Sequence, residues 1–301
     1  NEGVGATAPE QLQRAVVQHG AQGGIALDGD GDRLIMVDAR GEVLDGDELT
    51  YIIARHRQRL GRLAGTVVGT QMSNLGLELA LREQGLGFER AKVGDRYILE
   101  MLNANGWTVG GESSGHIICL DRHTTGDGMV SPLQVLAALR LQCASLEQAC
   151  ADLTLYPQTL VNVRLPGGFD WQKRPEIESA RIAAERELGE SGRVLLRASG
   201  TEPLLRVMVE GREAQQVASL AKGIAEVVQR AAAFGAESCC RIWISARPSC
   251  SSSWRASAAH WLKPPSFVRP LVSSATFGRS PDAAAPPVDG EADAVAFMTV
   301  I

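Results

Sequence analysis

The chain has 301 residues, with 35 acidic and 30 basic side chains and a net charge of −5 at neutral pH. This length predicts two or three domains with sizeable apolar cores. The acidic balance argues against a general nucleic-acid binder, and no segment approaches the roughly 18 consecutive apolar residues of a membrane-spanning helix. We therefore expect neither a nucleic acid nor a membrane as a partner.

The predicted elements divide the chain into blocks. In residues 1–45, Thr7 and Glu10 have the spacing of a capping box and predict a helix through His19. Short apolar runs then predict buried strands at 24–27 and 34–38. Because no earlier strands precede them, we interpret this block as the C-terminal part of an α/β domain.

Residues 46–155 alternate helix and strand patterns, which predicts a layered α/β domain with a mostly parallel sheet. Its helices are expected from Asp47, over 74–84, from Asp95 and over 128–141, and its strands at 66–69, near Phe88 and at 107–109. Residues 156–232 predict a smaller α+β domain with an antiparallel sheet. Its strands are expected at 160–164, 194–197 and 204–210, and its helices at 177–188 and 214–228.

Composition changes near Phe234. The 67 residues that follow hold seven of the 13 prolines and three of the six cysteines, without a helix or strand period. We expect an irregular, disordered tail over 233–301. The six cysteines show no CxxC spacing and the start of the chain does not resemble a signal peptide, so we expect reduced thiols in a cytoplasmic protein.

Three aspartates, Asp28, Asp30 and Asp32, alternate with glycines directly after the first predicted strand. Carboxylates at this spacing can converge on one point, where a hard divalent cation with oxygen ligands would neutralise them. Arg33 adds an anion-binding group beside the cation. A cation flanked by an arginine suits a phosphoryl group in transit.

Other interpretations of this loop exist. An EF-hand has the same start, but Ala39 stands where its bidentate glutamate would be. A phosphatase with Asp28 as an aspartyl nucleophile also fits the strand-Asp-x-Asp pattern. A solvated acidic turn is the remaining alternative, although three acids in five residues are costly without a counterion.

A polar loop, Gly110-Gly-Glu-Ser-Ser-Gly-His116, lies between two predicted strands. Glu112 can accept paired hydrogen bonds from a vicinal diol, as sugar-binding proteins do, and Ser114 adds a hydroxyl. His116 can move a proton. A plain polar turn is the alternative for this loop.

A second polar loop, Arg197-Ala-Ser-Gly-Thr-Glu-Pro203, follows a strand of the third block. The hydroxyls of Ser199 and Thr201, the amides around Gly200 and the guanidinium groups of Arg197 and Arg206 are what a phosphate cradle needs. A glycine-containing hairpin with incidental arginines is the alternative.

Two further motifs carry less information by themselves. Lys92, in Lys92-Val-Gly-Asp-Arg96, ends a predicted strand and can be an acid, a base, a phosphate anchor or a surface lysine. The stretch before Gly128 leads into a helix, and we expect Asp127 to cap it.

Taken together, these loops and their order over residues 1–231 resemble the α-D-phosphohexomutase superfamily. We name them, in chain order, the metal loop (Asp28–Arg33), the lysine loop (Lys92–Arg96), the sugar loop (Gly110–His116) and the phosphate loop (Arg197–Pro203). The sequences Gly-Glu-Ser-Ser-Gly-His and Arg-Ala-Ser-Gly-Thr-Glu-Pro are similar to its phosphoglucosamine mutase branch. The resemblance implies layered α/β domains with mixed sheets and a smaller α+β C-terminal domain. It divides the chain into part of a metal-binding domain II (1–45), a sugar-binding domain III (46–155) and a phosphate-binding domain IV (156–232).

The resemblance also implies an activity, the interconversion of glucosamine 6-phosphate and glucosamine 1-phosphate for bacterial cell-wall amino-sugar synthesis. A phosphoserine and a glucosamine 1,6-bisphosphate intermediate carry the phosphoryl group, with Mg²⁺ as cofactor. The implied metal ligands are Asp28, Asp30 and Asp32, and the implied catalytic residues are Arg33, Lys92 and His116. The implied substrate-binding residues are Glu112, Ser114, Arg197, Ser199, Gly200, Thr201 and Arg206.

The chain departs from the family pattern in one respect: the Ser-His-Asn-Pro type loop that carries the phosphoserine does not occur in it. We therefore expect a C-terminal portion that needs a separate phosphoserine domain as a partner. Two alternatives stay open, a phosphoglucomutase or phosphomannomutase, and a non-catalytic module that binds sugar phosphates.

Overall fold

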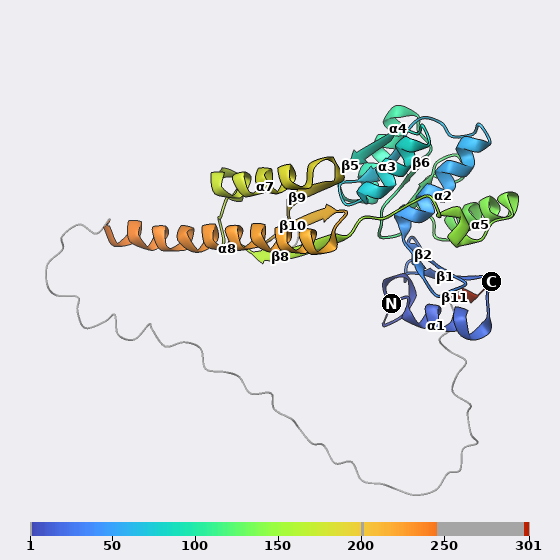
Figure 1. Ribbon diagram of the computed structural model, residues 1–301, viewed down its shortest axis with the longest axis horizontal. Coiled ribbons are helices and arrows are strands. Elements are labelled where there is room, and N and C mark those ends of the chain that lie inside the picture. The colour runs from blue at the N-terminus through green and yellow to red at the C-terminus, as the bar shows by residue number, and fades with distance from the viewer. Residues whose placement is uncertain (1, 200–201, 246–297, 301) are drawn as a thin grey trace, which may run out of the picture. The chain divides into compact units, whose positions relative to one another are not determined.

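The computed structural model describes residues 2–199, 202–245 and 298–300 (Figure 1). The described residues up to Ala233, together with 298–300, belong to one compact unit. No helix in these ranges combines the length and the apolar character needed to cross a membrane.

The first block is a small antiparallel sheet with one helix. Its strands β1 (Gly23–Leu27), β2 (Leu34–Asp38) and β3 (Val43–Leu44) are joined at the β1 edge by β11 (Met298–Val300), which lies beside β1 in Figure 1. The helix α1 (Glu10–His19) packs Leu12 and Val16 against the sheet, where Gly24 leaves room for both side chains. The predicted strands and helix are confirmed.

The predicted capping box of this helix is wrong. Pro9 is the N-cap residue and no side chain caps α1, because Thr7 belongs to a preceding 3-10 turn, η1 (Gly5–Thr7). Proline, with its fixed φ and missing N–H, is well suited to the start of a helix, and here it shifts the boundary by two residues.

The second block is a layered α/β domain. Its sheet has the order β5-β4-β6-β7, with β4 parallel to β5 and β6 and only β7 antiparallel, so the mostly parallel sheet is confirmed. The strands are β4 (Val67–Thr70), β5 (Phe88–Ala91), β6 (Val109–Gly111) and β7 (Ile117–Cys119). The helices are α2 (Gly46–Arg59), α3 (Leu75–Glu83), α4 (Asp95–Asn105), α5 (Val130–Gln142) and the short α6 (Leu146–Ala149).

The third block is the expected antiparallel α+β domain. Its sheet has the order β8-β10-β9, built from β8 (Gln158–Arg164), β9 (Gly192–Ala198) and β10 (Leu204–Gly211). The helices α7 (Pro175–Leu188) and α8 (Ala214–Ser245) share one apolar core with alternate residues of these strands. Short 3-10 turns, η2 (Trp171–Lys173) and η3 (Gly189–Ser191), flank α7.

The tail differs in part from the prediction. The helix α8 continues through 234–245, because the alanine-rich stretch around 231–233 has high helix propensity and carries the helix onward. Residues 298–300 form β11 rather than irregular structure. The rest of the predicted tail lies outside the described residues.

Candidate active site

The three aspartates of the metal loop converge as predicted. Asp28, Asp30 and Asp32 each offer a carboxylate oxygen, and these oxygens lie within 4.8 Å of one another. Asp32 Oδ1 is buried and has no hydrogen-bond partner among the described residues. An orphaned buried oxygen beside two more carboxylates fits a hard cation such as Mg²⁺, which binds through oxygen ligands. The donor set therefore suits the predicted metal.

Asp28 is the most buried of the three. Its Oδ1 accepts hydrogen bonds from the backbone N–H groups of Asp32 (3.2 Å) and Arg33 (3.1 Å), and its Oδ2 lies 3.6 Å from Arg33 Nε. Burial alone would raise the pKa of Asp28, but these hydrogen bonds outweigh burial and lower it. For Asp32, burial and the charges of Asp28 and Asp30 raise the pKa, against the opposing charge of His116.

The sugar loop lies on the metal loop. His116 Nε2 is 2.8 Å from Asp32 Oδ2, and Arg33 and His116 form an isolated antiparallel bridge. The Gly115 carbonyl accepts a hydrogen bond from Leu34 N at 3.0 Å. Gly115 has φ +98°, and a Cβ there would come within 2.3 Å of the Leu34 carbonyl oxygen, so only glycine allows this approach.

The lysine loop meets the sugar loop through its backbone. Gly94 N donates to Glu112 Oε1 at 2.7 Å, and Ser114 Oγ donates to Glu112 Oε2 at 3.1 Å. The Glu112 carboxylate is therefore fixed between two loops. Lys92 itself is exposed, and its Nζ lies 5.6 Å from the centre of the Tyr97 ring. Its assignment to the reacting phosphoryl group stays a prediction.

The phosphate loop joins β9 to β10. Arg197 and Arg206 are direct cross-strand partners, and the Nε atoms of both are buried without a hydrogen-bond partner in the described part of the chain. Burial and the charge of Arg206 lower the pKa of Arg197, and the charge of Glu112 opposes them. Glu112 thus acts electrostatically on the phosphate loop.

The remaining predicted residues of this loop are only partly described. Ser199 N donates to the Leu204 carbonyl, and Ser199 Oγ accepts from Glu202 N at 3.4 Å, which closes the hairpin. Gly200 and Thr201 lie outside the described residues.

Three residues next to the site were missed. Asp95 Oδ2 lies 4.0 Å from His116 Nε2, and it stands within the Lys92–Arg96 motif, so its position in that motif was the available signal. Gly46 N donates to the Ser113 carbonyl at 3.2 Å, and Asp47 is buried in the same helical turn.

The expected cap is confirmed, since Asp127 Oδ1 accepts from Met129 N and Val130 N.

The fold and its converging loops indicate the class of protein, and two family models show it. The alpha/beta/alpha domain III of phosphoglucomutase/phosphomannomutase matches residues 45–156, and the C-terminal domain of the same family matches residues 160–227. Together they cover more than half of the chain, which therefore belongs to the phosphoglucomutase/phosphomannomutase family.

Curated relatives indicate one branch of this family. Phosphoglucosamine mutase from Azoarcus sp. (strain BH72) is 65% identical over 233 residues, which is 77% of this chain and 51% of the relative. The phosphoglucosamine mutase of Aromatoleum aromaticum is 62% identical over 231 residues, again 77% of this chain and 51% of the relative. The chain thus spans about half the length of the curated relatives it matches.

Solved structures agree on the fold. N-acetylphosphoglucosamine mutase from Aspergillus fumigatus, solved in complex with GlcNAc-6P and magnesium, has a TM-score of 0.63 at 22% identity, covering 75% of this chain and 56% of that one. A phosphoglucomutase/phosphomannomutase family protein from Burkholderia thailandensis has a TM-score of 0.60 at 20% identity, covering 75% of this chain and 50% of that one.

Proposed function

We propose that this chain carries the metal, sugar and phosphate sites of a phosphoglucosamine mutase, which interconverts glucosamine 6-phosphate and glucosamine 1-phosphate. The phosphoserine that the reaction needs would come from residues outside these 301, because no Ser-His-Asn-Pro type loop occurs among them. The similarity to phosphoglucosamine mutases over 77% of the chain supports this choice of substrate.

One observation carries the proposal: the sugar loop contacts the metal loop. His116 Nε2 lies 2.8 Å from Asp32 Oδ2, while Glu112, four residues earlier, contributes to the charge environment of Arg197. A sugar phosphate held at both ends requires this convergence, because either end of the sugar must present itself to one reacting centre.

Each group has a role in this arrangement. Arg197 and Arg206 would hold the phosphate that is not reacting, since two guanidinium groups whose Nε donors have no partner among the described residues match its oxygens. The Glu112 carboxylate and the Ser114 hydroxyl would orient the sugar hydroxyls. His116, whose Nε2 lies 2.8 Å from Asp32 Oδ2, would move a proton at this atom.

Asp28, Asp30 and Asp32 would hold Mg²⁺. When bound, this ion would neutralise charge on the phosphoryl oxygens. The bonding of Asp28 supports a ligand over a nucleophile, because its Oδ1 already accepts two backbone hydrogen bonds and its Oδ2 faces Arg33. Arg33 would contribute a second positive group on the reacting side.

The test measures glucosamine 1-phosphate formed from glucosamine 6-phosphate, with Mg²⁺ and glucosamine 1,6-bisphosphate present. The full chain is assayed alone and then with a separately made first domain that carries the phosphoserine. We expect turnover only in the mixture. Turnover by the chain alone would contradict the proposal and turn attention to Asp28 as the residue that carries the phosphoryl group.

Parallel assays separate the alternatives. Glucose and mannose phosphates replace glucosamine phosphate in the same mixture, and faster turnover of either would assign the chain to a phosphoglucomutase or phosphomannomutase. Calorimetric titration of glucosamine 6-phosphate into the chain covers the remaining case. Binding with no turnover in any mixture would identify a non-catalytic sugar-phosphate module.

A further inference from the structure

One face of the β9–β10 hairpin carries four charged residues in two cross-strand pairs. Arg197 pairs with Arg206 near the loop, and Arg193 pairs with Glu210 four residues further along. Side chains alternate between the faces of a strand, and Val194, Val207 and Val209 face the apolar core with α7 and α8. Both charged pairs therefore lie on the opposite face, about 13 Å apart along the strands.

The second pair is bonded to the segment that links β4 to α3. Glu210 is fully buried, and its Oε1 accepts a hydrogen bond from Leu75 N, at the start of α3, at 2.9 Å. Its Oε2 accepts from Arg193 Nε at 2.5 Å. Arg193 in turn donates to the carbonyl oxygens of Gln71 (2.7 Å) and Ser73 (2.6 Å). A helix N-terminus and two loop carbonyls of the second block are thus bonded to the hairpin.

The same segment is also bonded to the sugar loop's neighbour, α2. Asp47 Oδ2 accepts from Asn74 N at 2.7 Å, and the preceding residue, Gly46, donates its N–H to the Ser113 carbonyl in the sugar loop. From β5, Arg90 donates to the Ser73 carbonyl at 2.7 Å as well. Side chains from α2, β5, β9 and β10 therefore converge on residues 70–75.

We propose that Arg193 and Glu210 are positioning residues that set the distance between the phosphate loop and the sugar loop. The proposal rests on the proposed function for the identity of these two loops. The hairpin acts as a rigid spacer: one end holds the anion, and the other is bonded to a segment shared with the sugar loop. Breaking this contact frees the hairpin without touching a group that binds the ligand.

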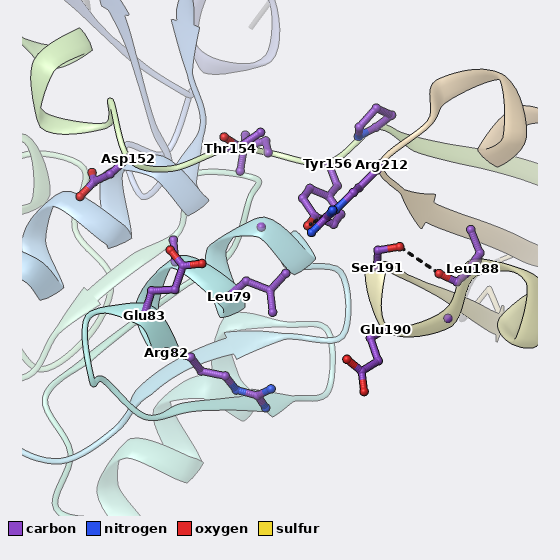
Figure 2. Close-up of a pocket in the computed structure, with 15 residues that line it drawn as sticks. Leu79, Arg82, Glu83, Asp152, Thr154, Tyr156, Leu188, Glu190, Ser191 and Arg212 are labelled. Atoms are coloured by element: carbon purple, nitrogen blue, oxygen red, sulfur yellow. Dashed lines mark hydrogen bonds between the residues drawn. The ribbon is translucent and has the colours of Figure 1, made fainter.

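A pocket of about 1110 Å³ opens beside this contact and gives a place to observe it. Its lining comes from α3, from residues 152 and 154–157 where the second block passes into the third, from the turn after α7 and from Arg212, as Figure 2 shows. Glu83 and Glu190 stand on either side of the pocket and are exposed. The distance between these two residues reports the position of the third block relative to α3.

The first test compares two ligands on the full chain by calorimetry. Glucosamine 6-phosphate has to reach both loops, whereas inorganic phosphate needs only Arg197 and Arg206. We expect Glu210→Ala to weaken glucosamine 6-phosphate binding about tenfold, the cost of roughly one buried charged hydrogen bond, with inorganic phosphate affinity unchanged. Glu210→Gln, which keeps an acceptor for Leu75 N, should fall between the wild type and Glu210→Ala. Equal weakening of both ligands, or of neither, would overturn the proposal.

The matched control is Arg181→Ala. Arg181 forms ion pairs with Glu178 and Glu185 inside α7 and does not take part in the contact with residues 70–75. This variant should bind both ligands as the wild type does. Arg197→Gln should lose both ligands, which confirms that they use the same anchor.

The second test needs no ligand and so separates this inference from the proposed function. Nitroxide labels are placed with Glu83→Cys and Glu190→Cys, in a background whose cysteines other than the buried Cys119 and Cys150 are serine. We expect one narrow distance distribution in the wild type and Arg181→Ala, and a broad one in Glu210→Ala. An unchanged distribution refutes the contact as a positioning device. A broad one, with no glucosamine 6-phosphate bound by any chain, would refute only the proposed function.

Discussion

Arg197 and Arg206 lie directly opposite each other on β9 and β10, and the buried Nε of each has no hydrogen-bond acceptor among the described residues. Two like charges in a cross-strand pair destabilise a sheet. The repulsion between the two guanidinium groups therefore lowers the stability of the fold. An anion that binds between the two arginines would restore this stability.

The first prediction follows from this repulsion. Arg206→Gln should leave the ligand-free chain as stable as the wild type, or more stable by up to about 1 kcal/mol, because the like-charge pair is gone. The same variant should lose the rise in melting temperature that inorganic phosphate gives the wild type. Thermal unfolding with and without phosphate measures both effects. Arg186→Gln, at an exposed position of α7, is the control and should keep the response to phosphate.

The second prediction concerns the metal loop. Asp30 is exposed and makes no hydrogen bond within the described residues, so Asp30→Asn should fold as the wild type does. Mg²⁺ at ten times its dissociation constant should stabilise the wild type by about 1.4 kcal/mol and Asp30→Asn far less. Urea unfolding with Mg²⁺, and again with a chelator, measures the difference. An equal Mg²⁺ effect in both chains would mean that the three carboxylates do not form the site.

The third prediction concerns Gly46, where α2 begins. A Cβ at this position would come within 1.9 Å of the Glu112 carbonyl oxygen, so either the helix or the sugar loop must move. We expect Gly46→Ala to cost about 1–3 kcal/mol, as overpacking does, and to weaken glucosamine 6-phosphate binding. Gly223→Ala is the matched control, since Gly223 lies in α8 and an added Cβ there would meet nothing within 4 Å. It should gain about 0.5–1 kcal/mol.

The fourth prediction concerns pH. Burial, reinforced by the charge of Asp45, raises the pKa of Asp47 to about 8, from 3.8 in an exposed aspartate. Between these values the folded chain keeps a proton that the unfolded chain has lost. Stability should therefore fall as the pH rises from about 4 to about 8, by up to roughly 1.4 kcal/mol per pH unit, and level off above.

Urea unfolding at pH 5, 6, 7 and 8 measures this slope. Asp47→Asn has no proton to lose and can still accept from Asn74 N, so its slope should be shallower than that of the wild type. Asp170→Asn is the control. The pKa of Asp170 is lowered by Lys173, so this residue is ionised in both states throughout the range and its replacement should not change the slope. Parallel slopes for the wild type and Asp47→Asn would contradict the prediction.

Much of the fold follows from local patterns. The short apolar runs of β1 and β2 predict strands, because a strand that is buried on both faces is apolar along its length. The end of α8 was not predictable in this way. Proline and serine composition marked a change near Phe234, but the alanines before it favour a helix that continues to Ser245.

In the candidate site too, local patterns predict some features and not others. The spacing of Asp28, Asp30 and Asp32 was sufficient to predict that their carboxylates meet, since five residues on one loop cannot place them far apart. The contact between His116 and Asp32 joins two loops more than 80 residues apart, and no local pattern encodes it.

Residue types and their spacing predict which loops carry the chemistry and in which order these loops follow the strands, because ligand type and turn geometry are local properties. Which loops touch, and how they are held, depends on the packing of the folded chain. Arg193 and Glu210 look like ordinary strand residues in the sequence, yet both are bonded to residues 71–75. Their role depends on burial and on partners more than 100 residues away, and both arise only when the blocks pack together.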